Sequence, residues 1–201
     1  MGKNRLEAFS DGVLAIIITI MVLEMKVPHG DQWKDLSNIL PVFLSYILSF
    51  IYIGIYWNNH HHMLHAAQHV SGGVMWANMH LLFWLSLVPF VSGWMGENHF
   101  TKIPVALYGV VLFMNAVAYY ILSQKLIRLH GRNSTLAAAV GKDGKGIVSV
   151  FLYLTAIGFA FLNTAISLAV YALVAVIWFI PDKRIEKKIL EHEHHTERET
   201  V

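Results

Sequence analysis

The sequence contains no cysteine and few charged residues. Without cysteine, a disulfide framework, a thiolate metal site and a cysteine nucleophile are all excluded, which removes several classes of enzyme. Only 14% of the 201 residues are Asp, Glu, Lys or Arg, whereas 56% are hydrophobic. A water-soluble domain of this length is rarely so apolar, so the composition predicts a membrane protein.

Long apolar segments recur along the chain. They lie at roughly 6–26, 38–58, 73–95, 103–124, 147–162 and 164–181. Most approach the ~20 residues that a bilayer-spanning helix requires. The last two form one run that is too long for a single span and is interrupted by Asn163, so we expect a tight helical hairpin there, with one long tilted helix as the alternative. We therefore predict an all-α membrane protein with six transmembrane helices in residues 1–181, followed by a charged tail at 182–201.

Lysine and arginine are distributed unevenly between the predicted loops. Under the six-helix interpretation one side carries Lys3, Arg5, Lys125, Arg128, Arg132, Lys142, Lys145, Lys183, Arg184, Lys187, Lys188 and Arg198. The other side carries Lys26, Lys34 and Lys102. Because cytoplasmic loops are enriched in these residues, we expect both termini and the 125–146 loop to lie in the cytoplasm.

A charged stretch directly precedes the first apolar run. Arg5, Phe9, Ser10 and Asp11 come before residues 12–23 and place ionisable side chains at the mouth of a membrane helix, where such groups are costly and usually functional. We expect a retained helix and not a cleaved signal peptide, because acidic residues stand where a basic region belongs. The run is about twelve residues long, short of the ~20 that lipid exposure favours, so the helix fits best at a bundle centre or along a pore.

Within this run, one stripe carries branched apolar side chains. Ile16, Ile20 and Leu23 share it at helical spacing, with Thr19 beside them. The stripe either lines a pore or packs against a neighbouring helix, and spacing alone does not decide between the two.

Three groups of residues resemble a known family. Arg5-x-x-x-Phe9-Ser10-Asp11 is similar to the signature of the transmembrane protein 175 family of potassium-permeable channels, specifically of a bacterial member with one six-helix repeat. Similar to the family's second and third helices are Tyr56-Trp57-x-x-His60-His61 and Asn78 followed by Pro89-Phe90. The resemblance covers helices one to three strongly, whereas helices four to six agree only in number and hydrophobicity.

The resemblance implies a homotetramer in the bacterial inner membrane, whose first helices surround a pore for potassium ions. Ile16, Ile20 and Leu23 would face the ions, and Thr19 would form a hydroxyl layer. The sequence contains no TVGYG-like loop, so we expect selectivity to come from an apolar constriction that penalises hydrated ions. Thr19 either supplies oxygens to the ion or bonds the carbonyl one turn back. No cofactor, nucleic acid or enzymatic activity is expected.

The charged motif is expected to stabilise the pore helix and not to touch the permeating ion. A carboxylate and a guanidinium are stable within a membrane mainly when they are paired and hydrogen-bonded. By resemblance, the partners of the motif around Phe9, Ser10 and Asp11 are Trp57, His60 or His61 on the second helix and Asn78 on the third.

A histidine cluster follows the second apolar segment. His61, His65 and His69 stand at successive i, i+4 steps, with His60 and His62 adjacent and His80 on the next helix. Such a face can bind zinc, but no carboxylate lies among these histidines and the H-E-x-x-H motif is missing, so we predict no metal site.

Two alternatives stay open. A proton- or metal-coupled secondary transporter would use Asp11 and the His60–His80 cluster, although no duplication between 1–95 and 103–181 supports it. A membrane metalloenzyme on the same cluster would need a nucleophile or base, and none stands at a convincing spacing.

Overall fold

A computed structural model describes residues 2–131, 134, 136–137 and 144–179. Regular structure in these residues is helical throughout, which confirms the all-α prediction. The helices are α1 (Lys3–Leu23), α2 (Trp33–Ser37), α3 (Leu40–His65), α4 (Gly72–Ser86), α5 (Val88–Glu97), α6 (Lys102–His130), α8 (Gly144–Phe159) and α9 (Thr164–Phe179). The predicted tail at 182–201 lies outside the described residues.

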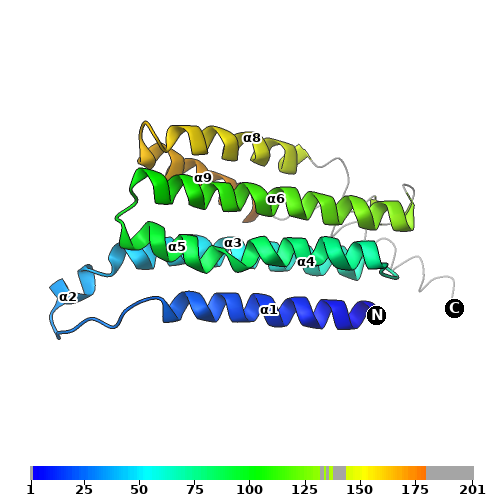
Figure 1. The fold of residues 1–201 in the computed structure, drawn as a ribbon, viewed down its shortest axis with the longest axis horizontal. Coiled ribbons are helices and arrows are strands. Elements are labelled where there is room, and N and C mark those ends of the chain that lie inside the picture. The colour runs from blue at the N-terminus through cyan, green and yellow to red at the C-terminus, as the bar shows by residue number, and fades with distance from the viewer. Residues whose placement is uncertain (1, 132–133, 135, 138–143, 180–201) are drawn as a thin grey trace, which may run out of the picture.

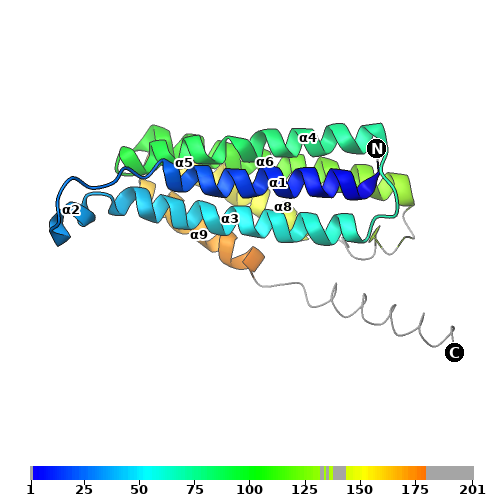
Figure 2. The ribbon, with the colours of Figure 1, turned by 90° about the horizontal axis from the view of Figure 1, so that it is seen from below.

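The long helices lie side by side and alternate in direction along the chain (Figures 1 and 2). Helix α1 lies on one side of the bundle and packs against α3, α4 and α5. Helix α6 lies between the α4–α5 pair and α8, and α9 packs against α8 and α3. The start of α1 and the ends of α3 and α6 therefore lie at the same end of the bundle, which we call the basic end because Lys3, Arg5, Lys125 and Arg128 lie there.

Four helical stretches of the described chain are long and apolar enough to cross a bilayer. They are Lys3–Leu23, Leu40–His65, Gly72–Glu97 and Lys102–His130. The two apolar helices α8 and α9 have 16 residues each. By the length and composition of these helices, the chain is a multi-pass membrane protein.

Two helices continue past their predicted ends. Helix α3 ends at His65 and not near 58, and α6 continues through the first residues of the predicted 125–146 loop to His130. Hydropathy marks where side chains prefer lipid, whereas a helix keeps its backbone hydrogen bonds when it enters water. The basic side chains Arg128 and His130 in the last turn of α6 also suit the negative end of the helix dipole.

The predicted single helix at 73–95 consists of two helices that meet at Leu87. Pro89 has no backbone N–H to bond the carbonyl of Leu85, and the Leu87 N–H bonds the Trp84 carbonyl at 3.2 Å in a tighter turn. The predicted hairpin at Asn163 is confirmed, because α8 ends at Phe159 and α9 begins at Thr164. The Asn163 side-chain oxygen accepts the N–H of Ala165 at 3.0 Å, which caps the start of α9.

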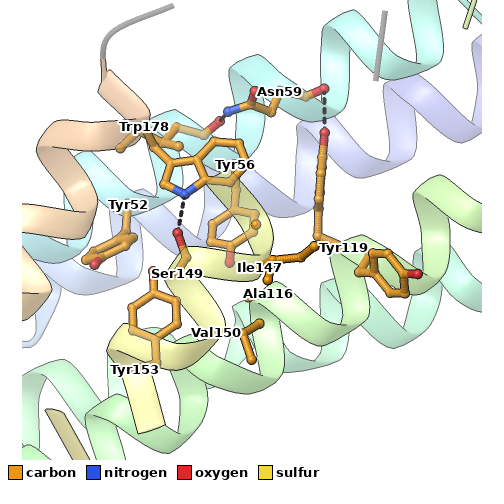
Figure 3. Close-up of a pocket in the computed structure, with 13 residues that line it drawn as sticks. Tyr52, Tyr56, Asn59, Ala116, Tyr119, Ile147, Ser149, Val150, Tyr153 and Trp178 are labelled. Atoms are coloured by element: carbon orange, nitrogen blue, oxygen red, sulfur yellow. Dashed lines mark hydrogen bonds between the residues drawn. The ribbon is translucent and has the colours of Figure 1, made fainter. Parts of the chain in front are cut away.

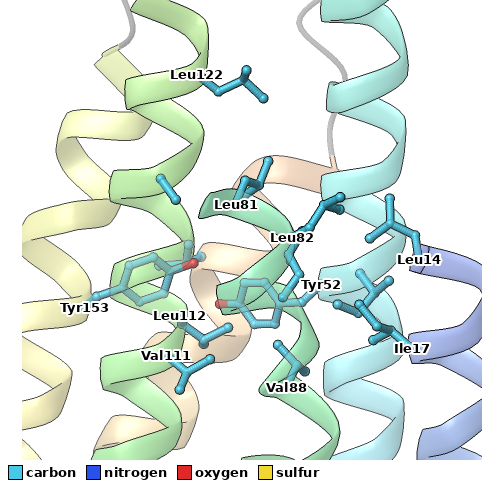
Figure 4. Packing of buried hydrophobic residues seen from close by; sticks show 14 of the residues in the cluster. Leu14, Ile17, Tyr52, Leu81, Leu82, Val88, Val111, Leu112, Leu122 and Tyr153 are labelled. Carbon is cyan, nitrogen blue, oxygen red and sulfur yellow. The ribbon is translucent and has the colours of Figure 1, made fainter. Parts of the chain in front are cut away.

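Helix α1 contributes one stripe to the core of the bundle. Its buried residues are Leu6, Ser10, Leu14, Ile17 and Met21. Figure 4 shows Leu14 and Ile17 on the α1 side of a cluster that continues through Leu82 towards α6.

Helices α3 and α5 approach each other closely at Gly96. A Cβ at Gly96 would lie 2.6 Å from Val42 Cα, so the absence of a side chain there allows the contact.

Candidate functional site

A buried chain of hydrogen bonds joins α1, α3 and α4. Ser10 Oγ donates to the Leu6 carbonyl at 2.8 Å, Asn78 Nδ2 donates to Ser10 Oγ at 2.9 Å, and His60 Nε2 lies 2.7 Å from Asn78 Oδ1. Ser10, Asn78 and His60 are each at most 1% exposed. Polar side chains that bond across helices in this way hold membrane helices together, because lipid offers no alternative partner.

Ser10 determines which groups donate and which accept in this buried chain of hydrogen bonds. Ser10 uses its hydroxyl hydrogen on the Leu6 carbonyl, so its oxygen accepts the amide N–H of Asn78. Asn78 therefore turns its carbonyl oxygen to His60, which must donate from Nε2. His60 Nδ1 is buried and has no hydrogen-bond partner among the described residues. In a neutral imidazole that donates from Nε2, this nitrogen carries no hydrogen.

A ladder of contacts joins α1 to α3 beside this buried chain. The contacts are Lys3 Nζ to the His65 carbonyl, Glu7 Oε1 to His61 Nδ1, and Asp11 Oδ1 to Trp57 Nε1, each at 3.1 Å. They recur every four residues along both helices, because the helices run antiparallel and one turn of each advances the pairing by one step. The His61 ring also lies between Trp57 and His65, with ring centroids 6.3 and 6.0 Å away. The ladder fixes the register of α1 against α3.

The structure separates the residues of the charged motif onto different faces of α1. Ser10 points into the bundle and Asp11 lies at the α3 edge, whereas Arg5 and Phe9 are exposed. Within the described residues, the Arg5 side chain makes no hydrogen bond or ion pair.

The predicted pore stripe lies on the side of α1 that faces away from the bundle. Ile16, Ile20 and Leu23 are 58%, 40% and 81% exposed. Thr19 is also exposed, and its hydroxyl donates to the Ile16 carbonyl at 2.9 Å. The stripe is therefore free to meet lipid, water or another copy of the chain, and it does not pack against a helix of its own chain.

The histidines do not form one metal-binding face. Helix α3 ends at His65, so His69 lies in the following loop, where its ring packs against His130 with centroids 4.6 Å apart. His80 accepts the Trp84 indole N–H at 3.0 Å. Across the described residues, no group of three His, Cys, Asp or Glu side chains is placed to hold a metal ion.

His130 instead connects α6 to the loop between α3 and α4. Its Nε2 accepts the backbone N–H groups of Gln68 at 2.9 Å and of His69 at 3.3 Å. Its Nδ1 lies 2.9 Å from the Leu126 carbonyl and donates to it, because Nε2 is occupied as an acceptor. Sequence reasoning missed this role, since nothing in the pattern of the sequence pairs the end of one helix with a distant loop.

At the end of the bundle opposite the basic end, an ion pair joins the chain after α1 to α5. Lys26 Nζ lies 2.9 Å from Glu97 Oε1. This hydrogen bond, together with the charges of Glu97 and Glu24, raises the pKa of Lys26 above its usual value. The first helix is thus attached to its neighbours at both ends.

Comparison with known proteins places this arrangement in a family. The family model described as "Endosomal/lysosomal potassium channel TMEM175" matches residues 5–89, which contain every member of the buried chain and all of the ladder except Lys3. A Chryseobacterium sp. protein named a potassium channel is 55% identical over 192 residues, which are 96% of this chain and 100% of that protein. A Streptomyces collinus protein, also named a potassium channel, is 31% identical over 88% of this chain and 91% of its own length.

A solved structure is also similar in fold. It is the crystal structure of a lysosomal potassium-selective channel TMEM175 homolog from Chamaesiphon minutus, which matches with a TM-score of 0.75 and 26% identity over 88% of this chain and 95% of that one. The family consists of ion channels and not of enzymes. The resemblance inferred from the charged motif is therefore confirmed, and the chain belongs to the TMEM175 family.

Proposed function

We propose that four copies of this chain assemble around a common axis into a potassium-preferring cation channel, with α1 of each copy lining the pore. The observation that carries the proposal is the division of α1 into two faces. One face, with Leu14 and Ile17, is buried in the bundle, whereas Ile16, Ile20 and Leu23 are exposed. A closed ring of copies is required, because one helix per chain cannot enclose a pore alone. The names of the relatives support permeation by potassium.

In this proposal the bilayer is the bacterial inner membrane, and α8 and α9 are the fifth and sixth transmembrane helices. Both helices are apolar and form a hairpin that packs on α3 and α6. An even number of spans returns the chain to the basic end of the bundle. By the distribution of lysine and arginine, that end and both termini lie in the cytoplasm.

Selectivity in this proposal comes from an apolar constriction. Rings of Ile16, Ile20 and Leu23 around the axis narrow the path and favour dewetting, so the ion that gives up water more readily crosses more easily. Potassium holds its hydration shell more weakly than sodium. Thr19 adds an oxygen at this level, and because its hydrogen is used on the Ile16 carbonyl, the lone pairs of that oxygen stay available to a cation.

The buried chain and the ladder hold the pore helix in position. Ser10, Asn78 and His60 attach α1 to two helices at once, and the contacts of Glu7 and Asp11 set its register. Since both groups of contacts lie nearer the basic end, they anchor the cytoplasmic half of α1 below the constriction. Their role is positioning, and none of these side chains needs to touch the ion.

Planar-bilayer recording of the purified channel tests the proposal. Under a potassium-against-sodium gradient, the wild type should reverse towards the potassium equilibrium potential, and Ile16→Asn should collapse that reversal potential. Ile166→Asn is the matched control, because Ile166 is 42% exposed in the first turn of α9, away from α1. Equal reversal potentials in all three proteins would remove Ile16 from the constriction.

The transporter alternative predicts a different result in the same preparation. It requires substrate-coupled flux into liposomes without a single-channel current. Asp11 and His60 have separate partners in the structure, Trp57 and Asn78, so their geometry does not favour a shared relay. Coupled flux without current would nevertheless replace the channel proposal.

A further inference from the structure

A cavity of about 190 Å³ lies in the part of the subunit remote from α1. Its walls come from α3, α6, α8 and α9, and each of these helices contributes an aromatic ring (Figure 3). The aromatic lining residues are Tyr52 and Tyr56 of α3, Tyr119 and Tyr120 of α6, Tyr153 of α8 and Trp178 of α9. The small side chain of Ala116 also lines the cavity from α6.

Several polar groups of the wall are already bonded within the protein. The Trp178 indole N–H donates to Ser149 Oγ at 2.8 Å, and Ser149 donates to the Lys145 carbonyl at 2.8 Å. The Tyr52 hydroxyl donates to the Tyr171 carbonyl at 2.7 Å. A buried water needs two to four polar partners, and these three side chains already use their hydrogens within the protein. The cavity is therefore suited to an apolar occupant.

The cavity reaches the surface on the side that meets lipid. Two of its lining residues, Tyr120 of α6 and Ile147 of α8, are 50% and 59% exposed. The outer face of α8 continues with Val148, Phe151 and Leu154, all exposed and apolar. In a multi-pass membrane protein such a face meets acyl chains, so the molecules at the mouth of the cavity are lipids.

We propose that this cavity binds one acyl chain of a membrane phospholipid, which enters between α6 and α8. Its volume exceeds the ~150 Å³ of an engineered apolar cavity that holds benzene, so several methylene groups fit. The bound chain contacts all four wall helices and fills the space between the α8–α9 hairpin and the rest of the bundle. This inference goes beyond the proposed channel function and does not depend on which ion permeates.

Trp178 reports on the occupant directly. The purified full-length protein is reconstituted in phosphatidylcholine vesicles with plain acyl chains or with chains brominated near their midpoint, since bromine quenches tryptophan fluorescence at contact range. The quenching of Trp178 is measured as the difference in quenching between a protein with Trp178 and the same protein carrying Trp178→Phe. We expect this difference to be at least twofold smaller in the Ala116→Phe protein, whose cavity is filled, than in the wild type.

A matched control and a second variant make the result specific. Ala169→Phe adds the same ring to an exposed position of α9 that does not line the cavity, and its quenching should equal that of the wild type. Val150→Phe, from the α8 side, replaces Ala116→Phe if that variant does not fold. Native mass spectrometry after delipidation should show one retained phospholipid per chain in the wild type and in Ala169→Phe, and none in the filled variants.

Two outcomes overturn the proposal. Equal Trp178 quenching in wild-type and filled proteins, with no retained lipid, would mean that acyl chains stay outside the cavity. Stabilisation of the wild type by added benzene, again without quenching by brominated chains, would assign the cavity to small aromatic molecules. Neither outcome changes the reversal potentials that test the channel, so the two proposals fail separately.

Discussion

Asn78 on α4 donates its amide hydrogen to the hydroxyl oxygen of Ser10 on α1 over 2.9 Å, across 68 residues of sequence. Because Ser10 already donates to the Leu6 carbonyl, this bond orients Asn78 and, through it, His60. One small side chain on α1 thus sets the donor and acceptor order of a hydrogen-bond chain that crosses three helices. Removing any member leaves another buried polar group without a partner, so each should contribute more than its own bond.

Replacing Asn78 with Ala should destabilise the protein. Ser10 and His60 would each lose a partner while staying buried, at a cost of about 1–3 kcal/mol per unsatisfied group. We expect a lower melting temperature of the detergent-solubilised protein by tryptophan fluorescence. Asn98→Ala is the control, since Asn98 is exposed and its side chain bonds only the Trp94 carbonyl among the described residues. Equal melting temperatures for both variants would show that the buried chain adds no stability.

Replacing Asp11 with Ala should impair assembly and conduction. The change removes the acceptor of the Trp57 indole N–H at the innermost rung of the ladder, so the register of α1 is less well held. Size-exclusion chromatography and bilayer currents provide the measurements. Trp57→Phe keeps an aromatic ring but removes the same hydrogen bond, and should show a weaker form of the defect.

Asp31→Ala serves as the control for both variants, because Asp31 lies exposed in the loop before α2. A stable Asp11→Ala channel with wild-type current would contradict the anchoring role.

Replacing Thr19 with Val should reduce the preference for potassium over sodium. Valine keeps the branched shape but removes the oxygen whose lone pairs we place towards the ion. Thr19→Ser retains the hydroxyl and should keep most of the preference. Reversal potentials under the same gradient as for Ile16→Asn decide the matter, and values identical to the wild type in Thr19→Val would exclude this hydroxyl from selectivity.

Replacing His130 with Ala should loosen the loop between α3 and α4. The backbone N–H groups of Gln68 and His69 lose their common acceptor, so local opening should become easier by about 1 kcal/mol and hydrogen exchange at these amides several-fold faster. Exchange measured by mass spectrometry on peptides that cover 66–71 tests this. His29→Ala, at an exposed position in the loop after α1, should leave this exchange unchanged.

The sequence by itself determined where the membrane helices lie and where the chain reverses. Apolar runs located each long helix, and Asn163 located the hairpin, because burial in lipid and helix capping are properties of short stretches of chain. It also determined the family, through the residues around Phe9, Ser10 and Asp11.

Tertiary structure decided how these residues are used. It turned Ser10 inward and left Arg5 outward on the same helix, paired Glu7 with His61 and Gln68 with His130, and divided the third apolar segment at Leu87. It also left a cavity beside Ala116. Each of these outcomes depends on the distance and orientation between helices that are far apart in sequence. Hydropathy only sums the preference of each side chain for lipid, so it contains no information about either quantity.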